Sequence, residues 1–394
     1  MTEHDRGQRG DRNKANEDSF AHGESGSPGT IPAERAATEG LPRGSERPLC
    51  AVYDTALLDL DGVVYAGGAA LPHAVESLRF ATEQAGMRLG YVTNNAARTP
   101  RTVAEHLTRL GVPVTESEVI TSALAVARLI AEHVPVGAPV LCAGGEGLRV
   151  ALRERGLRPV DSADDGPAAV VQGYGGPDMP WGMLAEAALA VGRGVPWFAS
   201  NTDATIPSGR GITPGNGAAV EVVRIATGHT REPVIAGKPA PPMHRESILR
   251  TGARRPLVVG DRLDTDIEGA HAGGVDALLV LSGVTDAPRL LAARPDHRPT
   301  YVAADLRGLL TPHPRVERDG DAFRCGGWRA VAGQGRLRLE EPGPADARDP
   351  SSGPAGLGGA PIDGLRALCA AAWAQAGPDR CTLPADDALS RLAL

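Results

Sequence analysis

The sequence predicts an α/β protein: a doubly wound, mostly parallel, Rossmann-like sheet with an inserted α/β cap domain. Three observations support this class. From residue 52 onward, short apolar runs typical of buried strands alternate with segments typical of helices, and such alternation predicts a mostly parallel sheet. Several apolar runs end in Asp, Asn or Lys, and sheets of this kind bind ligands at the carboxyl ends of their strands. The chain between two of these ends, Thr93 and Lys238, is much longer than one strand-to-helix connection needs.

Local signals predict the individual elements. The apolar run 56–60 is a predicted strand that ends in Asp-Gly, and residues 88–93 form the next one. Helices are expected over 72–86 and 100–111, because each segment begins with proline and ends with glycine. Thr99 is suited to be the N-cap of the second helix. Further strands are predicted at 139–143, 168–174, 195–200, 233–236, 256–260 and 276–281, and further helices at 179–193, 216–227, 241–251 and 265–272.

These elements divide the chain into four parts. Residues 1–48 have almost no apolar groups to bury, so we expect a disordered segment. The core domain comprises 49–136 and 232–312, with the cap domain, 137–231, inserted between its two halves. Residues 313–394 form a C-terminal extension. It contains a hairpin within 323–339 that turns at Gly326-Gly327 or Gly333-Gln334-Gly335, a Pro/Gly/Ser stretch, 341–361, and an Ala-rich helix, 363–376.

Composition and charge narrow the classes of function. The chain has 394 residues, of which 42% are hydrophobic and 23% charged, as is typical of a globular protein. A net charge of -7 argues against a nucleic-acid partner. No apolar run could span a bilayer, and the N-terminus has no signal-peptide pattern, so we expect no membrane partner. The scattered cysteines never form C-x-x-C, which favours reduced thiols in a cytoplasmic enzyme. A homo-oligomer stays open.

The strongest chemical signal is Asp59-Leu60-Asp61-Gly62 at the end of the first predicted strand. Side chains two residues apart on a strand point the same way, so Asp59 and Asp61 can face one site. Two such close carboxylates repel each other unless a cation joins them or one carries a proton. A hard cation such as Mg²⁺ satisfies this condition, as does a division of labour between nucleophile and acid. An ordinary Asp-Gly turn is the alternative.

Three other strand ends carry polar groups. Thr93-Asn94-Asn95 offers a hydroxyl and two amides suited to phosphoryl oxygens, although a capping turn would explain them too. Lys238, in Ala-Gly-Lys-Pro, could neutralise phosphate or aspartate charge, and its context is not a Walker A loop. The apolar run 257–260 ends in an acidic cluster: Asp261 is a candidate metal ligand, while Asp264 or Asp266 could equally cap the next helix.

In this order and strand context, the four motifs resemble those of the haloacid dehalogenase-like hydrolase superfamily, over about residues 54–310. The resemblance implies a Mg²⁺-dependent phosphatase that hydrolyses a small phosphorylated metabolite through an aspartyl-phosphate on Asp59. Asp61 would be the general acid/base, and it favours a phosphatase because the superfamily's dehalogenases lack this second Asp. The resemblance also implies phosphoryl binding by Thr93 and Lys238, with Asn94 and Asn95 beside them, and metal binding by Asp59, the backbone carbonyl of Asp61, Asp261 and, directly or through another ligand, Asp266.

The placement of the cap resembles one branch of that superfamily. This branch contains the p-nitrophenyl phosphatases and the pyridoxal phosphate, phosphoglycolate and glycerol-3-phosphate phosphatases. Residues 198–207 and 214–217 look like its cap segments. Within them, Asn201, Asp203 and Asn216 are candidate binding groups for substrate hydroxyls, with loop and capping roles equally open.

The C-terminal extension resembles the short acetyltransferase-like tail of actinobacterial glycerol-3-phosphate phosphatases. Glycerol 3-phosphate is therefore the favoured substrate, with phosphoglycolate, sugar phosphates and pyridoxal phosphate as alternatives. The tail is too short for a full acetyltransferase domain, and the stretch 330–335 lacks the Arg or Gln expected to open an acetyl-CoA loop. We expect it to serve packing or assembly.

Two functions of other classes compete with this interpretation. A receiver-type signalling domain also places Asp, Thr and Lys on a doubly wound sheet, but it needs neither the long insertion nor the Asp-x-Asp pair. A non-catalytic binding module that kept the fold is the other alternative. The presence of every expected catalytic residue argues against it.

Overall fold

The computed structural model describes residues 40–208, 210–341, 360–377 and 380–392. Most of the segment predicted to be disordered, residues 1–39, lies outside the described residues. Residues 40–48 pack on the core: the Arg43 backbone N–H donates to the Thr300 carbonyl at 2.8 Å, and Ser45 and His313 exchange two backbone hydrogen bonds. The predicted boundary at residue 48 therefore shifts toward the N-terminus, because pairing with the core satisfies these backbone groups.

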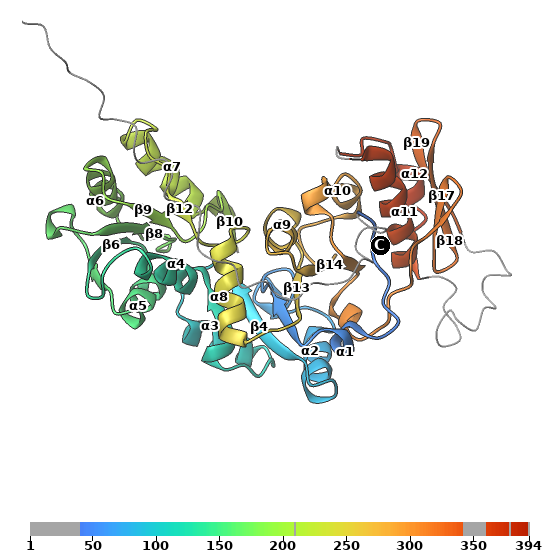
Figure 1. The fold of residues 1–394 in the computed structure, drawn as a ribbon, viewed down its shortest axis with the longest axis horizontal. Helices are drawn as coiled ribbons and strands as arrows, with labels where there is room; N and C mark the ends of the chain where they lie inside the picture. Colours follow the sequence, from blue (N-terminus) through green and yellow to red (C-terminus); the bar gives the residue numbers. More distant parts are fainter. Residues whose placement is uncertain (1–39, 209, 342–359, 378–379, 393–394) are drawn as a thin grey trace, which may run out of the picture. The chain divides into compact units, whose positions relative to one another are not determined.

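The core domain contains a six-stranded, fully parallel sheet (Figure 1). In spatial order its strands are β15 (Tyr301–Ala303), β14 (Asp276–Val280), β13 (Pro256–Gly260), β1 (Thr55–Leu58), β4 (Arg88–Thr93) and β5 (Val119–Thr121). β1 is central, and all four of its residues are buried. Because β1 runs parallel to both β13 and β4, the residues that follow these three strands meet at one edge of the sheet.

Side-chain alternation along β1 directs helices to both faces of this sheet. Ala56 and Leu58 belong to the apolar cluster on one face, whereas Leu57 belongs to the cluster on the other. The predicted N-cap is confirmed, since the Thr99 hydroxyl accepts a hydrogen bond from the Thr102 N–H at 3.2 Å. One face carries α1 (Leu49–Val52), α2 (Ala74–Glu83) and α3 (Pro100–Arg109), and the other carries α4 (Ser122–Ala131), α8 (Pro241–Thr251), α9 (Glu268–Ala272) and α10 (Ala287–Leu291). A small hairpin, β2 (Tyr65–Ala66) with β3 (Ala69–Ala70), follows β1.

The cap domain has a parallel sheet of its own. In spatial order its strands are β12 (Val234–Ile235), β9 (Trp197–Ala199), β8 (Ala169–Gln172), β6 (Pro139–Ala143) and β7 (Arg158–Val160). Its helices are α5 (Glu146–Glu154), α6 (Trp181–Gly192) and α7 (Asn216–Ala226), and β10 (Thr205–Ser208) and β11 (Gly211–Pro214) form an antiparallel hairpin. Because β12 pairs with β9, this sheet extends to residue 235, past the predicted cap boundary at 231.

The C-terminal extension is larger than the predicted hairpin and helix. It is a four-stranded antiparallel sheet of β16 (Glu317–Asp319), β17 (Ala322–Cys325), β18 (Trp328–Gly333) and β19 (Arg336–Glu340), with α11 (Pro361–Ala376) and α12 (Asp386–Leu389) packed on it. Both proposed turns are present, at 326–327 and 334–335. Most of the predicted linker, 342–359, lies outside the described residues.

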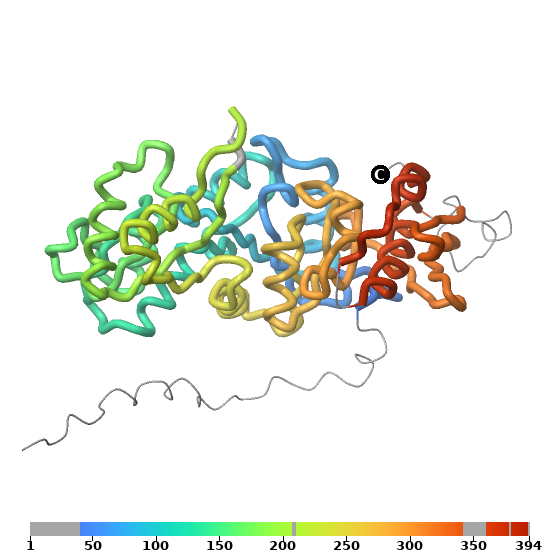
Figure 2. Tube along the Cα trace, turned by 90° about the horizontal axis from the view of Figure 1, so that it is seen from above, coloured from blue at the N-terminus to red at the C-terminus, as the bar shows by residue number. Residues whose placement is uncertain are grey.

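One apolar cluster joins this extension to the core. Phe323, Trp328, Leu365 and Trp373 lie in the same cluster as the core residue Leu279. Figure 2 shows the C-terminal extension, in red and dark orange, beside the orange end of the core domain. α11 is the longest of the described helices, and none of them is long and apolar enough to cross a membrane.

Candidate active site

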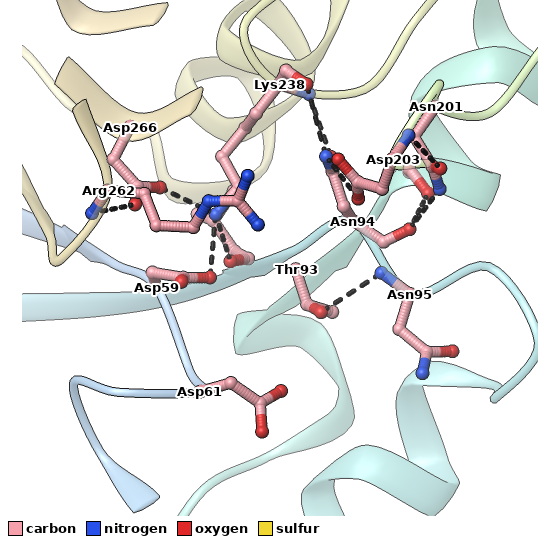
Figure 3. A network of polar contacts seen from close by, with 12 residues as sticks. Asp59, Asp61, Thr93, Asn94, Asn95, Asn201, Asp203, Lys238, Arg262 and Asp266 are labelled. Atoms are coloured by element: carbon pink, nitrogen blue, oxygen red, sulfur yellow. Dashed lines mark hydrogen bonds and ion pairs between the residues drawn. The ribbon is translucent and has the colours of Figure 1, made fainter. Parts of the chain in front are cut away.

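Three acidic side chains and one lysine meet at the carboxyl edge of the core sheet (Figure 3). Asp59 follows β1, and its backbone N–H donates to the Val259 carbonyl at 2.8 Å. The Lys238 Nζ donates to Asp59 Oδ1 at 2.6 Å and to Asp266 Oδ1 at 2.7 Å. Burial alone would lower the pKa of Lys238, but the Asp266 and Asp59 carboxylates outweigh it and raise that pKa, so the lysine stays charged.

Asp261, after β13, completes the acidic group. One ligand oxygen each from Asp59, Asp261 and Asp266 lies within 4.8 Å of the others. Asp261 Oδ2 accepts the Val284 N–H at 2.6 Å, but its buried Oδ1 has no hydrogen-bond partner among the described residues. Burial, then the charges of Asp59 and Asp266, raise the pKa of Asp261 to about 7. A buried oxygen without a partner beside two more carboxylates is the environment that a divalent cation satisfies, so these residues fit a metal.

Glycines leave room for Asp261. A Cβ on Gly62 or Gly283 would clash with the Asp261 carboxylate, and Gly62 also has a φ of +83°. The Gly62 carbonyl accepts a hydrogen bond from the Ser282 hydroxyl at 2.7 Å. Asp61-Gly62 is therefore part of a turn after β1, as the Asp-Gly alternative predicts, and Gly62 also packs against Asp261, a candidate metal ligand.

Asp61 lies apart from the acidic cluster. Its Oδ2 accepts a hydrogen bond from the Tyr65 hydroxyl at 3.1 Å, and its carboxylate points away from the Lys238 ammonium in Figure 3. The surrounding protein raises the pKa of Asp61, while the Tyr65 hydrogen bond and the charges of Arg98 and Lys238 oppose this rise. An acid with a raised pKa beside a nucleophile is suited to donate a proton. The sequence had placed Asp61 at this edge but not Tyr65, which stands four residues further along the same motif.

The residues at the end of β4 and directly after it have three different sets of contacts. Thr93 is buried at the end of β4, the strand that pairs with β1, and its hydroxyl oxygen accepts the Asn95 N–H at 3.1 Å. Asn95 Oδ1 accepts the N–H groups of Ala97 and Arg98 at 3.0 and 3.2 Å, so this side-chain oxygen caps a turn. Asn94 instead holds the backbone of Lys238 on both sides, because its Oδ1 accepts from the Lys238 N–H and its Nδ2 donates to the Lys238 carbonyl.

The cap residues Asn201 and Asp203 lie against Asn94. Asp203 Oδ2 accepts from Asn94 Nδ2 at 3.1 Å, and Asn201 Nδ2 donates to the Asn94 carbonyl at 2.7 Å. Burial raises the pKa of Asp203, and Asn94, Arg262 and Lys238 oppose that rise. Asn216 is buried and donates to the Asn201 carbonyl at 2.7 Å, so it supports this loop from within the cap.

Arg262 was not among the residues that the sequence motifs predicted for the site. This half-buried side chain forms two hydrogen bonds to Asp264, at 3.1 and 2.9 Å. Asp264 therefore pairs with Arg262, whereas Asp266 contacts both Lys238 and the Arg262 backbone N–H. The sequence contained a signal for Arg262, because an arginine that lies between Asp261 and Asp264 can pair with a neighbouring carboxylate.

Comparisons with known proteins agree with this geometry. Residues 56–158 match a haloacid dehalogenase-like hydrolase family model, and a second model of such hydrolases matches residues 235–309. The two matched segments flank most of the cap. Residues 325–394 match a GCN5-related N-acetyltransferase like domain.

Several similar proteins are phosphatases. A D-glycerol 3-phosphate phosphatase of Mycobacterium tuberculosis is 47% identical over 257 residues, which cover 65% of this chain and 71% of that one. An acid sugar phosphatase of Staphylococcus saprophyticus is 36% identical over 260 residues, 66% of this chain and 97% of its own. A crystal structure of a glycerol phosphate phosphatase from Mycobacterium tuberculosis in complex with magnesium matches with a TM-score of 0.75 and 38% identity, covering 88% of this chain and 99% of that one.

Proposed function

This chain belongs to the haloacid dehalogenase-like hydrolase family and is a phosphatase acting on a small phosphate ester, and we propose that it is a Mg²⁺-dependent phosphatase of glycerol 3-phosphate. The observation that carries the chemistry is the cluster of Asp59, Asp261, Asp266 and Lys238 at one sheet edge. The substrate is proposed from the similarity to the glycerol phosphate phosphatases.

In the proposed reaction, Asp59 and Asp61 divide the work. An oxygen of the Asp59 carboxylate attacks the phosphorus in line, the bond between phosphorus and the glycerol oxygen breaks, and Asp61 gives its proton to that oxygen. Asp61 then takes a proton from a water molecule, whose oxygen attacks the phosphorus of the aspartyl-phosphate. This attack breaks the bond to Asp59 and releases inorganic phosphate.

The charges around Asp59 serve this reaction. Lys238 pairs with the Asp59 carboxylate at 2.6 Å and offsets part of the negative charge on the phosphoryl group. The buried Thr93, near Asp59, is proposed to bind a phosphoryl oxygen. Asp59, the Asp61 backbone carbonyl and Asp261 would hold Mg²⁺, with Asp266 beside them. When bound, the cation offsets the repulsion between the anionic nucleophile and the anionic ester.

A substrate comparison tests this proposal. We expect glycerol 3-phosphate to have a higher kcat/KM than pyridoxal phosphate, phosphoglycolate or p-nitrophenyl phosphate. A rival that exceeded it by more than about tenfold, roughly 1.4 kcal/mol in transition-state preference, would exclude the substrate and leave the phosphatase in place. Activity should vanish on exhaustive chelation and return with Mg²⁺. Ca²⁺ should support little turnover because its looser coordination disturbs in-line geometry.

The setting of the enzyme is part of the proposal. All five cysteines lie buried as free thiols, which supports a cytoplasmic protein working on a free metabolite without nucleic-acid or membrane partners. A homo-oligomer remains a prediction, which light scattering on the full chain tests.

A further inference from the structure

Asn94 contacts both the backbone of Lys238 and the cap loop that contains Asn201 and Asp203, a combination that no other described residue of the site has. On the core side, its Oδ1 accepts the Lys238 N–H at 2.8 Å and its Nδ2 donates to the Lys238 carbonyl at 3.1 Å. On the cap side, the same Nδ2 donates to Asp203 Oδ2 at 3.1 Å, and the Asn94 carbonyl accepts from Asn201 Nδ2 at 2.7 Å. The figure of the site shows these contacts as one continuous network beside the nucleophile (Figure 3).

The contacts on the core side fix the position of the Lys238 backbone. With both backbone polar groups of Lys238 held by one amide, the side chain extends from a fixed point to Asp59 and Asp266. The backbone of the neighbouring Gly237 packs closely against the same residues, because a Cβ there would lie only 2.6 Å from Asn94 Oδ1 and 3.1 Å from the Asn201 Cβ. A small displacement of Asn94 must therefore displace the Lys238 backbone.

The cap contacts belong to a loop that is fixed within the cap itself. The Asp203 N–H donates to Asn201 Oδ1 at 3.2 Å, and the Asp203 carbonyl accepts the Gly217 N–H at 2.9 Å. Asn216, at the start of α7, donates to the Asn201 carbonyl. Asp203 and Asn201 thus move with α7, and their bonds to Asn94 transmit the position of the cap to the core.

We propose that Asn94 is a positioning residue: it couples the cap loop Asn201–Asp203 to Lys238, so that the lysine is correctly placed on Asp59 only when the cap loop is in place. Asn94 acts through Lys238 and not by binding the substrate. This inference rests on the proposed phosphatase mechanism and changes the role expected for Asn94, Asn201 and Asp203, from binding the substrate to aligning the site.

A charge swap between Asn94 and Asp203 tests the coupling. Asn94→Asp keeps the acceptor for the Lys238 N–H, removes the donor to the Lys238 carbonyl and sets two carboxylates against each other at the 3.1 Å contact with Asp203. We expect kcat to fall by roughly 10²-fold, the scale of a small misplacement of a catalytic group, with KM nearly unchanged. Asp203→Asn alone keeps an acceptor for Asn94 and should cost less than about threefold. The double variant Asn94→Asp/Asp203→Asn restores a donor–acceptor pair at the cap contact but not the donor to the Lys238 carbonyl, so it should recover only the part of kcat that is lost to the carboxylate repulsion.

The controls separate this outcome from others. Assays use p-nitrophenyl phosphate, so the result does not depend on glycerol 3-phosphate being the substrate, and Asp59→Asn gives the background rate. Asp164→Asn, in an exposed ion pair of the cap with Arg193, makes the same chemical change away from the site and should keep wild-type kcat. If Asn94→Asp does not fold, Asp203→Ala takes its place, with an expected five- to tenfold loss in kcat at constant KM.

Three results would overturn the coupling. A loss that appears mainly in KM would show that Asn94 contacts the substrate directly. A double variant no faster than Asn94→Asp would show that the cap contact does not act on Lys238. Wild-type kcat in folded Asn94→Asp would show that the contacts of Asn94 do not affect the placement of Lys238. A failure of the phosphatase proposal itself looks different, since the wild-type rate would then not exceed that of Asp59→Asn.

Discussion

The protein buries charged side chains in two places, and the two are satisfied to different degrees. At the site, three carboxylates lie together, Lys238 pairs with only two of them, and Asp261 Oδ1 has no partner among the described residues. Under the C-terminal extension, Arg366 donates to Asp363 Oδ1 at 2.5 Å, to the Val302 carbonyl at 3.0 and 2.6 Å, and to His313 Nδ1 at 3.0 Å.

The difference indicates what each cluster does. Burying a charge without compensation is unfavourable, so a fully satisfied network such as that of Arg366 is compatible with a purely structural role. The excess of negative charge near Asp59 is retained against that cost, which points to a cation and to chemistry. Perturbing the first cluster should therefore remove activity, and perturbing the second should remove stability.

The largest effect is expected at the nucleophile. Asp59→Asn should reduce turnover to the background rate, because an amide oxygen cannot form the acyl phosphate. The matched control is Asp54→Asn at the opposite end of β1, where the carboxylate accepts from the Thr55 hydroxyl and the Arg254 N–H. Release of inorganic phosphate from both variants is the measurement. Near-normal turnover in Asp59→Asn would exclude the proposed mechanism.

Asp61→Asn should have the next largest effect, slowing turnover of an alkyl phosphate by roughly 10²- to 10⁴-fold. The loss should be smaller for p-nitrophenyl phosphate, whose leaving group needs little protonation. Tyr65→Phe removes only the 3.1 Å hydrogen bond to Asp61 and should cost no more than about tenfold. Equal losses for both substrates in Asp61→Asn would count against its role as the general acid.

The sequence could predict the core of the site because strand periodicity is local. Asp59, Lys238 and Asp261 each follow an apolar run, and parallel pairing of β1 with its neighbours then brings two of the runs together. The detailed contacts could not be predicted this way. Whether Asn94 faces a phosphate or the Lys238 backbone depends on how two domains meet, which no local pattern records.

The extension shows the same limit in another form. The sequence predicts its turns and helix, since Gly326-Gly327 and the Ala-rich run are local signals. The sequence does not show that this helix is buried on nearly all sides between the small sheet and the core. There, the Trp373 indole N–H donates to the carbonyl of the core residue Leu290 at 3.2 Å. Small residues such as alanine allow this close packing, yet alanine is equally common in exposed helices.

The stability prediction concerns Arg366, which is 5% exposed. Arg366→Met should lower the free energy of unfolding by about 3–5 kcal/mol, because it leaves the buried Asp363 carboxylate without its partner. The control is Arg329→Met in the same extension, which breaks an exposed pair with Glu340 and should cost less than about 1 kcal/mol. Denaturant titration measures both. Equal destabilisation by the two variants would show that the buried network contributes no more to the free energy of unfolding than an exposed ion pair does.

The smallest expected effect concerns His313, which the Arg366 network holds neutral. Because an arginine can only donate, His313 Nδ1 must accept from it, and Nε2 then donates to the Gly308 carbonyl at 2.8 Å. Burial, followed by the charge of Arg366, lowers the pKa of His313 to about 4, and the Gly308 hydrogen bond opposes this only in part. A proton on Nδ1 would point at the guanidinium, so the folded protein resists it.

The sign of the pH dependence follows from this depressed pKa. In the unfolded chain His313 binds a proton as the pH falls through its ordinary value of about 6.5, whereas the folded protein does so only near 4. Between these values the unfolded state binds more protons, so stability should fall on acidification, by up to about 3 kcal/mol. His313→Gln can keep both hydrogen bonds without titrating. The stability of this variant relative to the wild type should therefore rise as the pH falls from 6.5 to 4. A difference independent of pH would show that folding does not lower the pKa of His313.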